Sequence, residues 1–372
     1  MYISTGSGRS QKKIDLLLLT VVIILSVFGI IAVYSSSYYS LEFYGLSRMQ
    51  KVFDHIIRLL LGLILMFIFM VIPSRYYKKY APYVFSVSIF FLLLLIPFGR
   101  KVLGAKRWLP LGPINFQPSE FAKFALIFFL ASLIARNRRS IKKLKFFFIL
   151  TAPIAIVFLL TLIQPSVSMA TLILITSFSL IFVAGARISH MLLPVVLSAV
   201  IGFGVYSASP ETFSHVKERI RSFKKGDSYQ SLQAKIAIAE GKLLGEGLGK
   251  SKQKYFYLPQ AQEDFIYSIF CEETGFAGGA TVIFLFLIFI VRGFKIAETL
   301  IKHKLFEGLL AFGITFMIGI YALAHIAVNL GLGPTTGLPL PFISFGGTSL
   351  LINLSATGVL LGLSSQAGEL AE

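Results

Sequence analysis

The chain has 372 residues, of which 56% are hydrophobic and 14% are charged, and its formal net charge is +18. Soluble domains carry about 25% charged residues, so this composition excludes a soluble globular protein and predicts a polytopic membrane protein. The single cysteine, Cys271, lies in an apolar run, which excludes a disulfide framework and a cysteine-based zinc site.

Apolar stretches long enough to cross a hydrocarbon core of about 30 Å recur along the chain. Each must be helical, because the bilayer core contains no water to satisfy the backbone. We expect an all-α polytopic fold of ten transmembrane helices that forms a single domain, residues 1–372. The expected spans are Leu16–Tyr34, Ile56–Ile72, Tyr80–Phe98, Ser119–Ala135, Phe146–Ile163, Ser168–Ala184, Met191–Ser207, Phe265–Val291, Phe306–Leu330 and Gly347–Leu363.

The distribution of lysine and arginine predicts the orientation. These residues are dense before the first span and after the second and fourth spans, which places that side, and with ten spans both termini, in the cytoplasm. One large extracytoplasmic loop, residues 208–264, joins the seventh and eighth spans. The outer loops are almost as basic, against the topology rule, so they indicate either a solvated loop beside anionic lipid or a site for a phosphorylated ligand.

The outer segment after the third span contains charged residues at the start of a predicted helix. Pro118 suits the first turn of that helix, which makes Glu120 and Lys123 neighbours on one face just below the outer surface. At that depth they form either a self-neutralising structural pair or part of a watery cleft. Arg107, beside Trp108, is either an interface anchor or a planar partner for a phosphate.

The large loop contains a predicted surface helix and a glycine-rich stretch. The sequence HVKERIRSFKK, which ends at Lys225, has apolar positions at helical spacing and predicts a cationic helix on the membrane surface. Further on, Gly249-Lys250-Ser251 resembles the end of a phosphate-binding loop. That interpretation fails, because the required glycine five residues earlier is Leu244 and no strand precedes it. The glycines instead predict a tight backbone path.

Asp264 ends the large loop directly before the eighth span. Small and polar residues follow it at spacings of three and four, beginning with Ser268 and Glu272, and we expect this face to line a groove. An acid at a helix N-terminus is often only a cap or dipole partner. Asp264, however, is the acid of this loop that the helix would hold against basic residues from the loops.

The segment between the last two spans, Val328–Leu351, contains three prolines and the pair Gly346 and Gly347, which exclude a helix. Irregular backbone beside the bilayer is tolerated only where it is buried in protein or lines an aqueous cavity. Its free N–H groups could bind an anion. Side chains that could assist are Ser344, Thr348 and Ser349. In the ninth span, His325 and Asn329 favour interhelical hydrogen bonds over ligand binding.

A resemblance to a known family rests on three blocks, RWLPLGPINFQPSEFAK, QKYFYLPQAQEDFIYSIFCEETGFAGG and GLGPTTGLPLPFISFGGTSLL. In this order they resemble the signature blocks of the SEDS family, the bacterial FtsW, RodA and SpoVE proteins, and the similarity covers nearly the whole chain. The run Gln253–Pro259 favours the division and sporulation members, whereas Pro339 favours RodA. On balance we expect an FtsW-like chain.

The resemblance implies an activity and partners. Family members are peptidoglycan glycosyltransferases, which polymerise lipid II on the outer face of the cytoplasmic membrane together with a class B penicillin-binding protein, a transpeptidase. It therefore implies lipid II, that transpeptidase and other division or elongation proteins as partners, and no nucleic acid. It implies no organic cofactor and leaves room for a divalent cation, Mg or Mn.

The resemblance also implies roles for single residues. Asp264 matches the acid before Phe-Ile in the family's Leu-Pro…Asp-Phe-Ile block and would be catalytic. The residues implied to bind substrate are Arg107, Gln117, Glu120, Lys123, Gln233, Ser344, Gly346, Gly347 and Thr348. The family commonly has Gln-Pro-Asp after the fifth span, but here Ser166 replaces the acid. This puts any essential role of that second acid in doubt and leaves Asp264 more alone.

The implied reaction joins an α-linked diphosphate donor into a β-1,4-linked polymer, so one displacement inverts the anomeric centre and needs one base. Asp264 would be that base, and the outer cations would stabilise the departing diphosphate. Two alternatives stay open, a flippase for the lipid-linked precursor and a non-catalytic division scaffold. A transporter usually places its polar site near the midplane on repeat-related broken helices, whereas the charged candidates here lie at the outer ends of spans.

Overall fold

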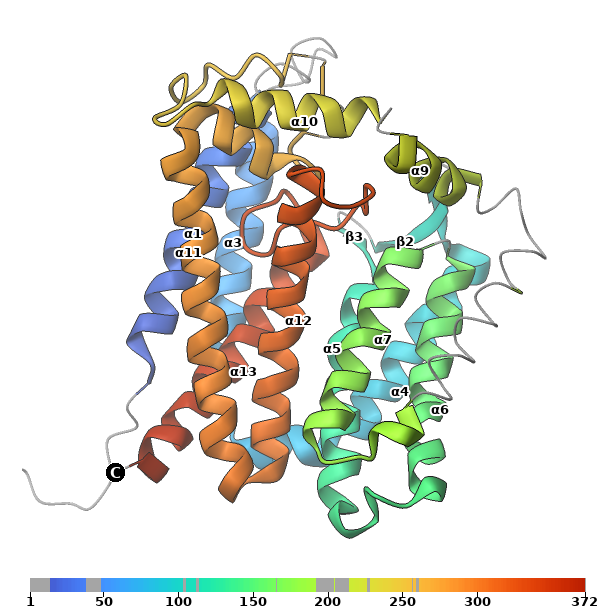
Figure 1. Cartoon of the computed structure of the whole chain (residues 1–372). Coiled ribbons are helices and arrows are strands. Elements are labelled where there is room, and N and C mark those ends of the chain that lie inside the picture. Colours follow the sequence, from blue (N-terminus) through green and yellow to red (C-terminus); the bar gives the residue numbers. More distant parts are fainter. Residues whose placement is uncertain are drawn as a thin grey trace, which may run out of the picture.

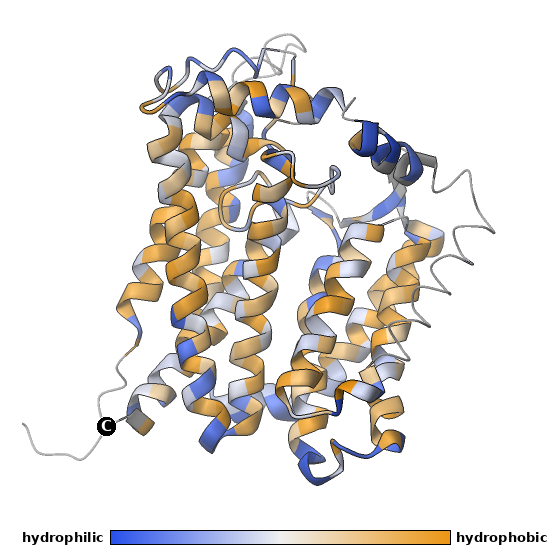
Figure 2. Cartoon of the chain, in the orientation of Figure 1, coloured by the Kyte–Doolittle hydropathy of each residue, from blue (hydrophilic) through white to orange (hydrophobic). Residues whose placement is uncertain are grey.

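The computed structural model describes residues 14–37, 48–102, 105–111, 114–164, 166–191, 204, 214–225, 228–255, 257–258 and 261–371. Its long helices run side by side as a bundle (Figure 1), with apolar residues along their middle and hydrophilic residues towards both ends (Figure 2). Eight of the described helices are long and apolar enough to cross a membrane, and Val167–Val183 is a shorter apolar helix. The prediction of a polytopic helical membrane protein is confirmed.

The described helices follow the expected order. Those that correspond to expected spans are α1 (Leu16–Ser36), α3 (Arg48–Val71), α4 (Ser74–Phe98), α5 (Pro118–Arg136), α6 (Leu144–Ile163), α7 (Val167–Val183), α11 (Ile266–His303), α12 (Leu305–Asn329) and α13 (Gly347–Ala371). Several are longer than expected, because helical hydrogen bonding continues past the apolar stretch while charged side chains extend to water. The seventh expected span, Met191–Ser207, lies almost wholly outside the described residues, so the count of ten stays a prediction.

Most of the described elements that are not spans lie at the end of the bundle that the charge pattern assigns to the outside (Figure 1). They are α9 (Ser214–Lys225), α10 (Tyr229–Glu240) and an antiparallel sheet of β1 (Arg100–Val102), β2 (Ala105–Leu111) and β3 (Ile114–Phe116). Because its strands are short and contain a proline and charged residues, the sheet was not expected from the sequence. The predicted cationic helix is confirmed as α9, which is strongly hydrophilic in Figure 2.

The proline-rich loop between α12 and α13 is anchored in the core. The Phe342 side chain is 1% exposed, and its ring centroid lies 5.9 Å from that of Phe289 and 6.5 Å from that of Phe286, both on α11. Large aromatic groups buried in this way hold irregular backbone in place. The expectation of a non-helical segment is confirmed for residues 330–346, of which 338–344 are largely buried in protein. The two ends of the expected range, residues 328–329 and 347–351, instead belong to α12 and α13.

The long helix α11 is broken at Gly275, whose φ is 72° and ψ is −170°. Residues 242–247 of the loop after α10 satisfy the backbone groups that the break leaves free. The hydrogen bonds are Phe276 N–H to Lys242 O at 2.8 Å, Ala277 N–H to Leu243 O at 3.1 Å, Glu246 N–H to Glu272 O at 3.0 Å and Gly247 N–H to Glu273 O at 3.1 Å. Since buried backbone groups need partners, the glycine-rich loop and the outer part of α11 form one hydrogen-bonded unit.

Gly245→Ala is expected to destabilise the protein more than Gly249→Ala. Both glycines have positive φ, 84° and 80°, where a Cβ is unfavourable. A Cβ at Gly245 would lie 2.1 Å from the carbonyl oxygen of Glu273, whereas a Cβ at Gly249 would meet no atom within 4 Å. We expect a Tm lower by at least about 3 °C for Gly245→Ala than for Gly249→Ala in thermal unfolding in detergent. Equal Tm values would contradict the tight contact.

Candidate active site

The backbone around Asp264 is fixed by α12 and by the loop that follows it. Three consecutive carbonyls of this segment accept hydrogen bonds from those elements. They are Gln262 O from Phe345 N–H at 3.0 Å, Glu263 O from Ser344 Oγ at 2.7 Å and Asp264 O from Asn329 Nδ2 at 3.1 Å. The position of the acid is therefore set by residues that are far from it in the sequence, and α11 alone does not determine it.

Asn329 links α12 to the first turn of α11. Its Oδ1 accepts hydrogen bonds from Ser268 N–H at 3.1 Å and from Ser268 Oγ at 2.7 Å. His325 Nδ1 donates to the carbonyl oxygen of Leu338 at 2.8 Å. The expected hydrogen-bonding role of these two α12 residues is confirmed. The expectation that Ser268 and Glu272 line a groove is wrong, because both are 0% exposed and are covered by Asn329 and by the loop after α10.

The Asp264 carboxylate lies outside the spans and faces two arginines. Burial raises the pKa of Asp264 to about 6, and the positive charges of Arg219 and Arg107 oppose this rise. Arg107, on β2, donates through Nε to Gln164 O at 3.2 Å, and Arg219, on α9, donates through Nη1 to Thr335 O at 3.3 Å. Each arginine is held at a backbone carbonyl, so the acid and the cations are preorganised.

The neighbouring acid, Glu263, faces a different pair of cations. Burial and the charge of Asp264 raise the pKa of Glu263 to about 7, while Lys51 and Arg58 from α3 lower it. The guanidinium carbon of Arg58 also lies 5.1 Å from the centroid of the Phe345 ring, where a cation is attracted by the aromatic face. Two adjacent acids thus each have their own cations, an arrangement that suits a ligand carrying several negative charges.

The start of α13 adjoins the start of α5. Gln117 N–H donates to Thr348 Oγ1 at 3.1 Å, and Thr348 Oγ1 donates to Asn115 O at 3.1 Å. A Cβ added at Gly347 would lie 3.7 Å from the guanidinium of Arg58, so this glycine lies directly beside the cation. Of the expected site residues, Arg107 acts on the charge of Asp264, Ser344 contacts the carbonyl of Glu263, and Gly347 lies against Arg58. Gln117 and Thr348 contact each other beside this group, and Gly346 precedes α13 in the same turn.

Other expected site residues lie deeper or farther away. Lys123 Nζ lies 2.7 Å from Glu120 Oε2, with the two side chains 0% and 1% exposed, and 3.8 Å from the centroid of the Tyr321 ring. The predicted neighbouring pair on one face of α5 is confirmed, and a ligand could contact Lys123 only if this ion pair opened. Gln233 is half-buried on α10, which packs on α11 and α12.

Sequence reasoning did not assign Lys51, Arg58 and Arg219 to the site. For Arg58 there was a signal, because a charged residue inside an apolar span marks a functional position by default. Arg219 is one of several cations on α9, and nothing in the sequence distinguishes it from its neighbours. Only the packing of α9 and of α3 towards the loop before α11 brings these side chains to the acids.

The described residues contain no group of three His, Cys, Asp or Glu side chains that could hold a metal ion. The two acids of the site already face four cationic side chains. This donor set does not fit a divalent ion held by the protein, because such an ion needs several oxygen ligands and few neighbouring cations.

Comparisons with known proteins agree with one another. Residues 15–369 match a family model described as "Cell cycle protein", that of FtsW, RodA and SpoVE. The chain is 36% identical over 361 residues to stage V sporulation protein E of Bacillus subtilis, which covers 94% of this chain and 96% of that protein. It is 37% identical over 364 residues to a probable peptidoglycan glycosyltransferase FtsW of Trichlorobacter lovleyi, with 94% and 93% covered.

Solved structures are similar over nearly the whole length. One chain of a peptidoglycan synthase complex that coordinates polymerization and crosslinking is 26% identical, with a TM-score of 0.73, and 95% of this chain and 98% of that chain are covered. The rod shape-determining protein RodA of Thermus thermophilus is 24% identical, with a TM-score of 0.68 and with 94% and 96% covered. This second likeness concerns the fold.

Proposed function

Because the chain belongs to the family of FtsW, RodA and SpoVE cell cycle proteins, we propose that it polymerises lipid II into glycan strands as a peptidoglycan glycosyltransferase. It is an integral membrane protein. One observation carries the site assignment, namely that a half-buried carboxylate, Asp264, is fixed by its backbone contacts and faces Arg107 and Arg219 at one end of the bundle. This end would face away from the cytoplasm. Lipid II is polymerised on that outer side of the membrane.

The reaction follows from the stereochemistry of the substrate. The donor sugar is attached to its diphosphate in the α configuration and the polymer is β-1,4 linked, so a single in-line displacement inverts C1. Asp264 takes the proton from the C4 hydroxyl of the acceptor as that oxygen attacks C1 of the donor. The C1–O bond to the diphosphate breaks, and the diphosphate leaves with the electron pair. General-base assistance of this kind contributes on the order of 10² to 10⁴-fold.

The cations around the site stabilise the leaving diphosphate. Arg107 offers a planar guanidinium that can make two parallel hydrogen bonds to phosphate oxygens. Arg219 and Arg58 add positive charge, and the first turn of α13, which begins at Gly347, supplies N–H groups that have no partner within the helix. We derive no step through a divalent cation, and any Mg or Mn would have to arrive with the diphosphate of the substrate.

The partners and the location are part of the proposal. A class B penicillin-binding protein would crosslink the strands that this chain makes, as the similarity to a chain of a peptidoglycan synthase complex supports. We place the protein in the cytoplasmic membrane, with both termini inside and with an FtsW-like role at the division site. The curated relatives named FtsW and the sporulation protein support this role over a RodA-like role.

The experiment that tests the function supplies lipid II to the detergent-purified protein together with its transpeptidase partner and scores glycan strands. Formation of polymer would support the glycosyltransferase assignment, because detergent leaves no bilayer for a flippase to cross. Failure to form polymer, combined with transport of labelled lipid II across the membrane of proteoliposomes, would favour the flippase. If neither polymer formation nor transport were observed, the remaining hypothesis would be a non-catalytic scaffold of the division complex.

The pH dependence of polymerisation is a further expectation. The base must be ionised to accept a proton, so the rate should fall as the pH drops through the raised pKa of Asp264, about 6. Glu263, with a pKa of about 7, titrates with it, so the measured midpoint belongs to the pair. We expect initial rates measured from about pH 5 to pH 8 to decline about tenfold per pH unit at the acid end. A flat profile over this range would contradict the assignment.

A further inference from the structure

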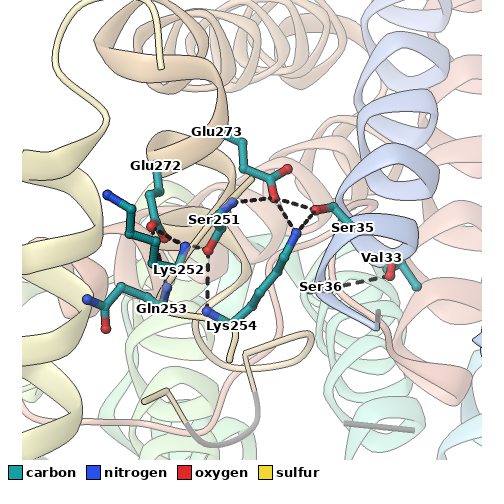
Figure 3. A network of polar contacts seen from close by, with 9 residues as sticks. All are labelled: Val33, Ser35, Ser36, Ser251, Lys252, Gln253, Lys254, Glu272 and Glu273. Carbon is teal, nitrogen blue, oxygen red and sulfur yellow. Dashed lines mark hydrogen bonds and ion pairs between the residues drawn. The ribbon is translucent and has the colours of Figure 1, made fainter. Parts of the chain in front are cut away.

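A buried polar cluster, shown in Figure 3, joins the two ends of the chain segment that carries Asp264. The cluster joins residues 251–254, from the loop after α10, to Glu272 and Glu273 on α11 and to Ser35 at the end of α1. Asp264 lies between the two halves of the cluster in the sequence, so the cluster closes the chain segment that contains it. The catalytic role of this cluster rests on the function proposed above.

Glu273 is the centre of the cluster. Its Oε1 accepts hydrogen bonds from Lys254 Nζ at 2.9 Å, from Ser251 N–H at 3.3 Å and from Ser35 Oγ. Lys254 Nζ also donates to Ser35 Oγ at 3.0 Å. The side chains of Lys254 and Glu273 are 0% and 3% exposed, so this ion pair is shielded from water and removal of one partner would be costly.

Glu272 supports the same loop through hydrogen bonds. Its Oε1 accepts from Lys252 N–H at 2.6 Å and from Gln253 N–H at 3.4 Å, and its Oε2 accepts from Ser251 Oγ. The loop after α10 is therefore bonded to the outer part of α11 by two sets of contacts. One is the backbone pairing at the α11 break, and the other is this group of side-chain contacts. None of the contacts reaches Asp264 directly, so any effect of the cluster on catalysis acts through the position of the segment.

We propose that Glu273 is a positioning residue, which, through Lys254 and Ser35, holds the Asp264 segment at the distance from Arg107 and Arg219 that catalysis requires. The break at Gly275 makes such a clamp necessary. The outer part of α11 is separated from the inner part by a non-helical residue, so the helix alone does not fix its outer end. A misplacement of about 1 Å at the reacting groups lowers a rate by on the order of 10²-fold.

The test compares Glu273→Gln with Glu298→Gln in the full chain. The glutamine side chain would keep the size of Glu273 and one of its acceptor oxygens but would remove the charge that pairs with Lys254. Glu298 is a matched control on the same helix, because it pairs with Lys302 at 2.9 Å at the opposite end and is 70% exposed. Ser35→Ala provides a milder variant that removes one hydroxyl and leaves both charges.

Two readouts separate positioning from a loss of folded protein. With lipid II, Glu273→Gln should lower kcat by on the order of 10 to 10²-fold and change KM by less than about threefold. The acid limb of its pH profile should move to higher pH, because Asp264 would be farther from the arginines that lower its pKa. Ser35→Ala should change these quantities in the same direction by less, and Glu298→Gln should change none.

The second readout does not depend on activity. Cys271 is the single cysteine of the chain, is 3% exposed and lies two residues before Glu273. If the cluster clamps the segment, Glu273→Gln should let N-ethylmaleimide modify Cys271 at least about tenfold faster through local opening. Unchanged thiol reactivity would overturn the clamp. Faster modification with unchanged kcat and acid limb would overturn the positioning role. Absence of polymer from the unmodified protein would overturn the proposed function, while the thiol readout would still decide the clamp.

Discussion

Asp264→Asn is expected to lower the rate of polymerisation by on the order of 10² to 10⁴-fold, the contribution of a general base. Asparagine has nearly the same size, so the hydrogen bond from Asn329 to the carbonyl of residue 264 should persist. What is lost is an ionised oxygen that can accept a proton. The loss should therefore appear in kcat, with a small change in KM for lipid II. The measurement is the initial rate of strand formation by the purified protein with its transpeptidase partner.

The matched control for this substitution is Glu218→Gln. Glu218 is an exposed acid on α9, at the same end of the bundle and beside Arg219. Its removal changes the net charge by the same amount but takes no base from the site, so the rate should be unchanged. Both variants should unfold at the temperature of the unmodified protein. Polymerisation by Asp264→Asn at the unmodified rate would remove Asp264 from the mechanism.

Arg107→Met is expected to lower kcat by on the order of 10² to 10³-fold, the usual effect of removing one preorganised donor to a developing negative charge. A second effect follows from the same charge. Arg107 lowers the pKa of Asp264, so its removal should raise that pKa and move the acid limb of the rate profile to higher pH. The kcat of Arg107→Lys should lie between those of Arg107→Met and the unmodified protein, because lysine keeps the charge but lacks the planar guanidinium.

Arg100→Met provides the control for Arg107→Met. Arg100 lies on β1 of the same sheet and is exposed, so its loss should change neither the rate nor the acid limb. Rates measured from about pH 5 to pH 8 separate the two effects of Arg107. A lower rate without movement of the acid limb would leave Arg107 as a ligand of the diphosphate only. An unchanged rate would contradict its place in the site.

The fold class was predictable because one physical rule applies along the whole chain. Without water in the bilayer core, every apolar stretch of sufficient length must be a helix, and the described spans follow that rule. The Glu120–Lys123 ion pair was predictable from helical spacing, because residues three apart are neighbours on one face of a helix. The prolines and glycines before α13 excluded a helix there by their own backbone properties.

The break in α11 and the sheet before α5 could not be predicted in this way. The chain is helical on both sides of Gly275, and the partners for the backbone at the break come from the loop after α10. The strands of the sheet are short and depend on packing against the outer ends of α4, α5 and α13. Strand propensity is set by such contacts more than by the residues themselves.

The sequence by itself determined the apolar spans, the basic outer loops and, through the family resemblance, the acid at position 264. The tertiary structure decided which cations face that acid. Arg58 and Glu263 are brought together by the packing of α3 against the turn before α13, and Arg219 reaches Asp264 from α9. Sequence patterns report the hydrogen bonds and apolar faces of neighbouring residues, whereas a site with charges from distant helices depends on how those helices pack.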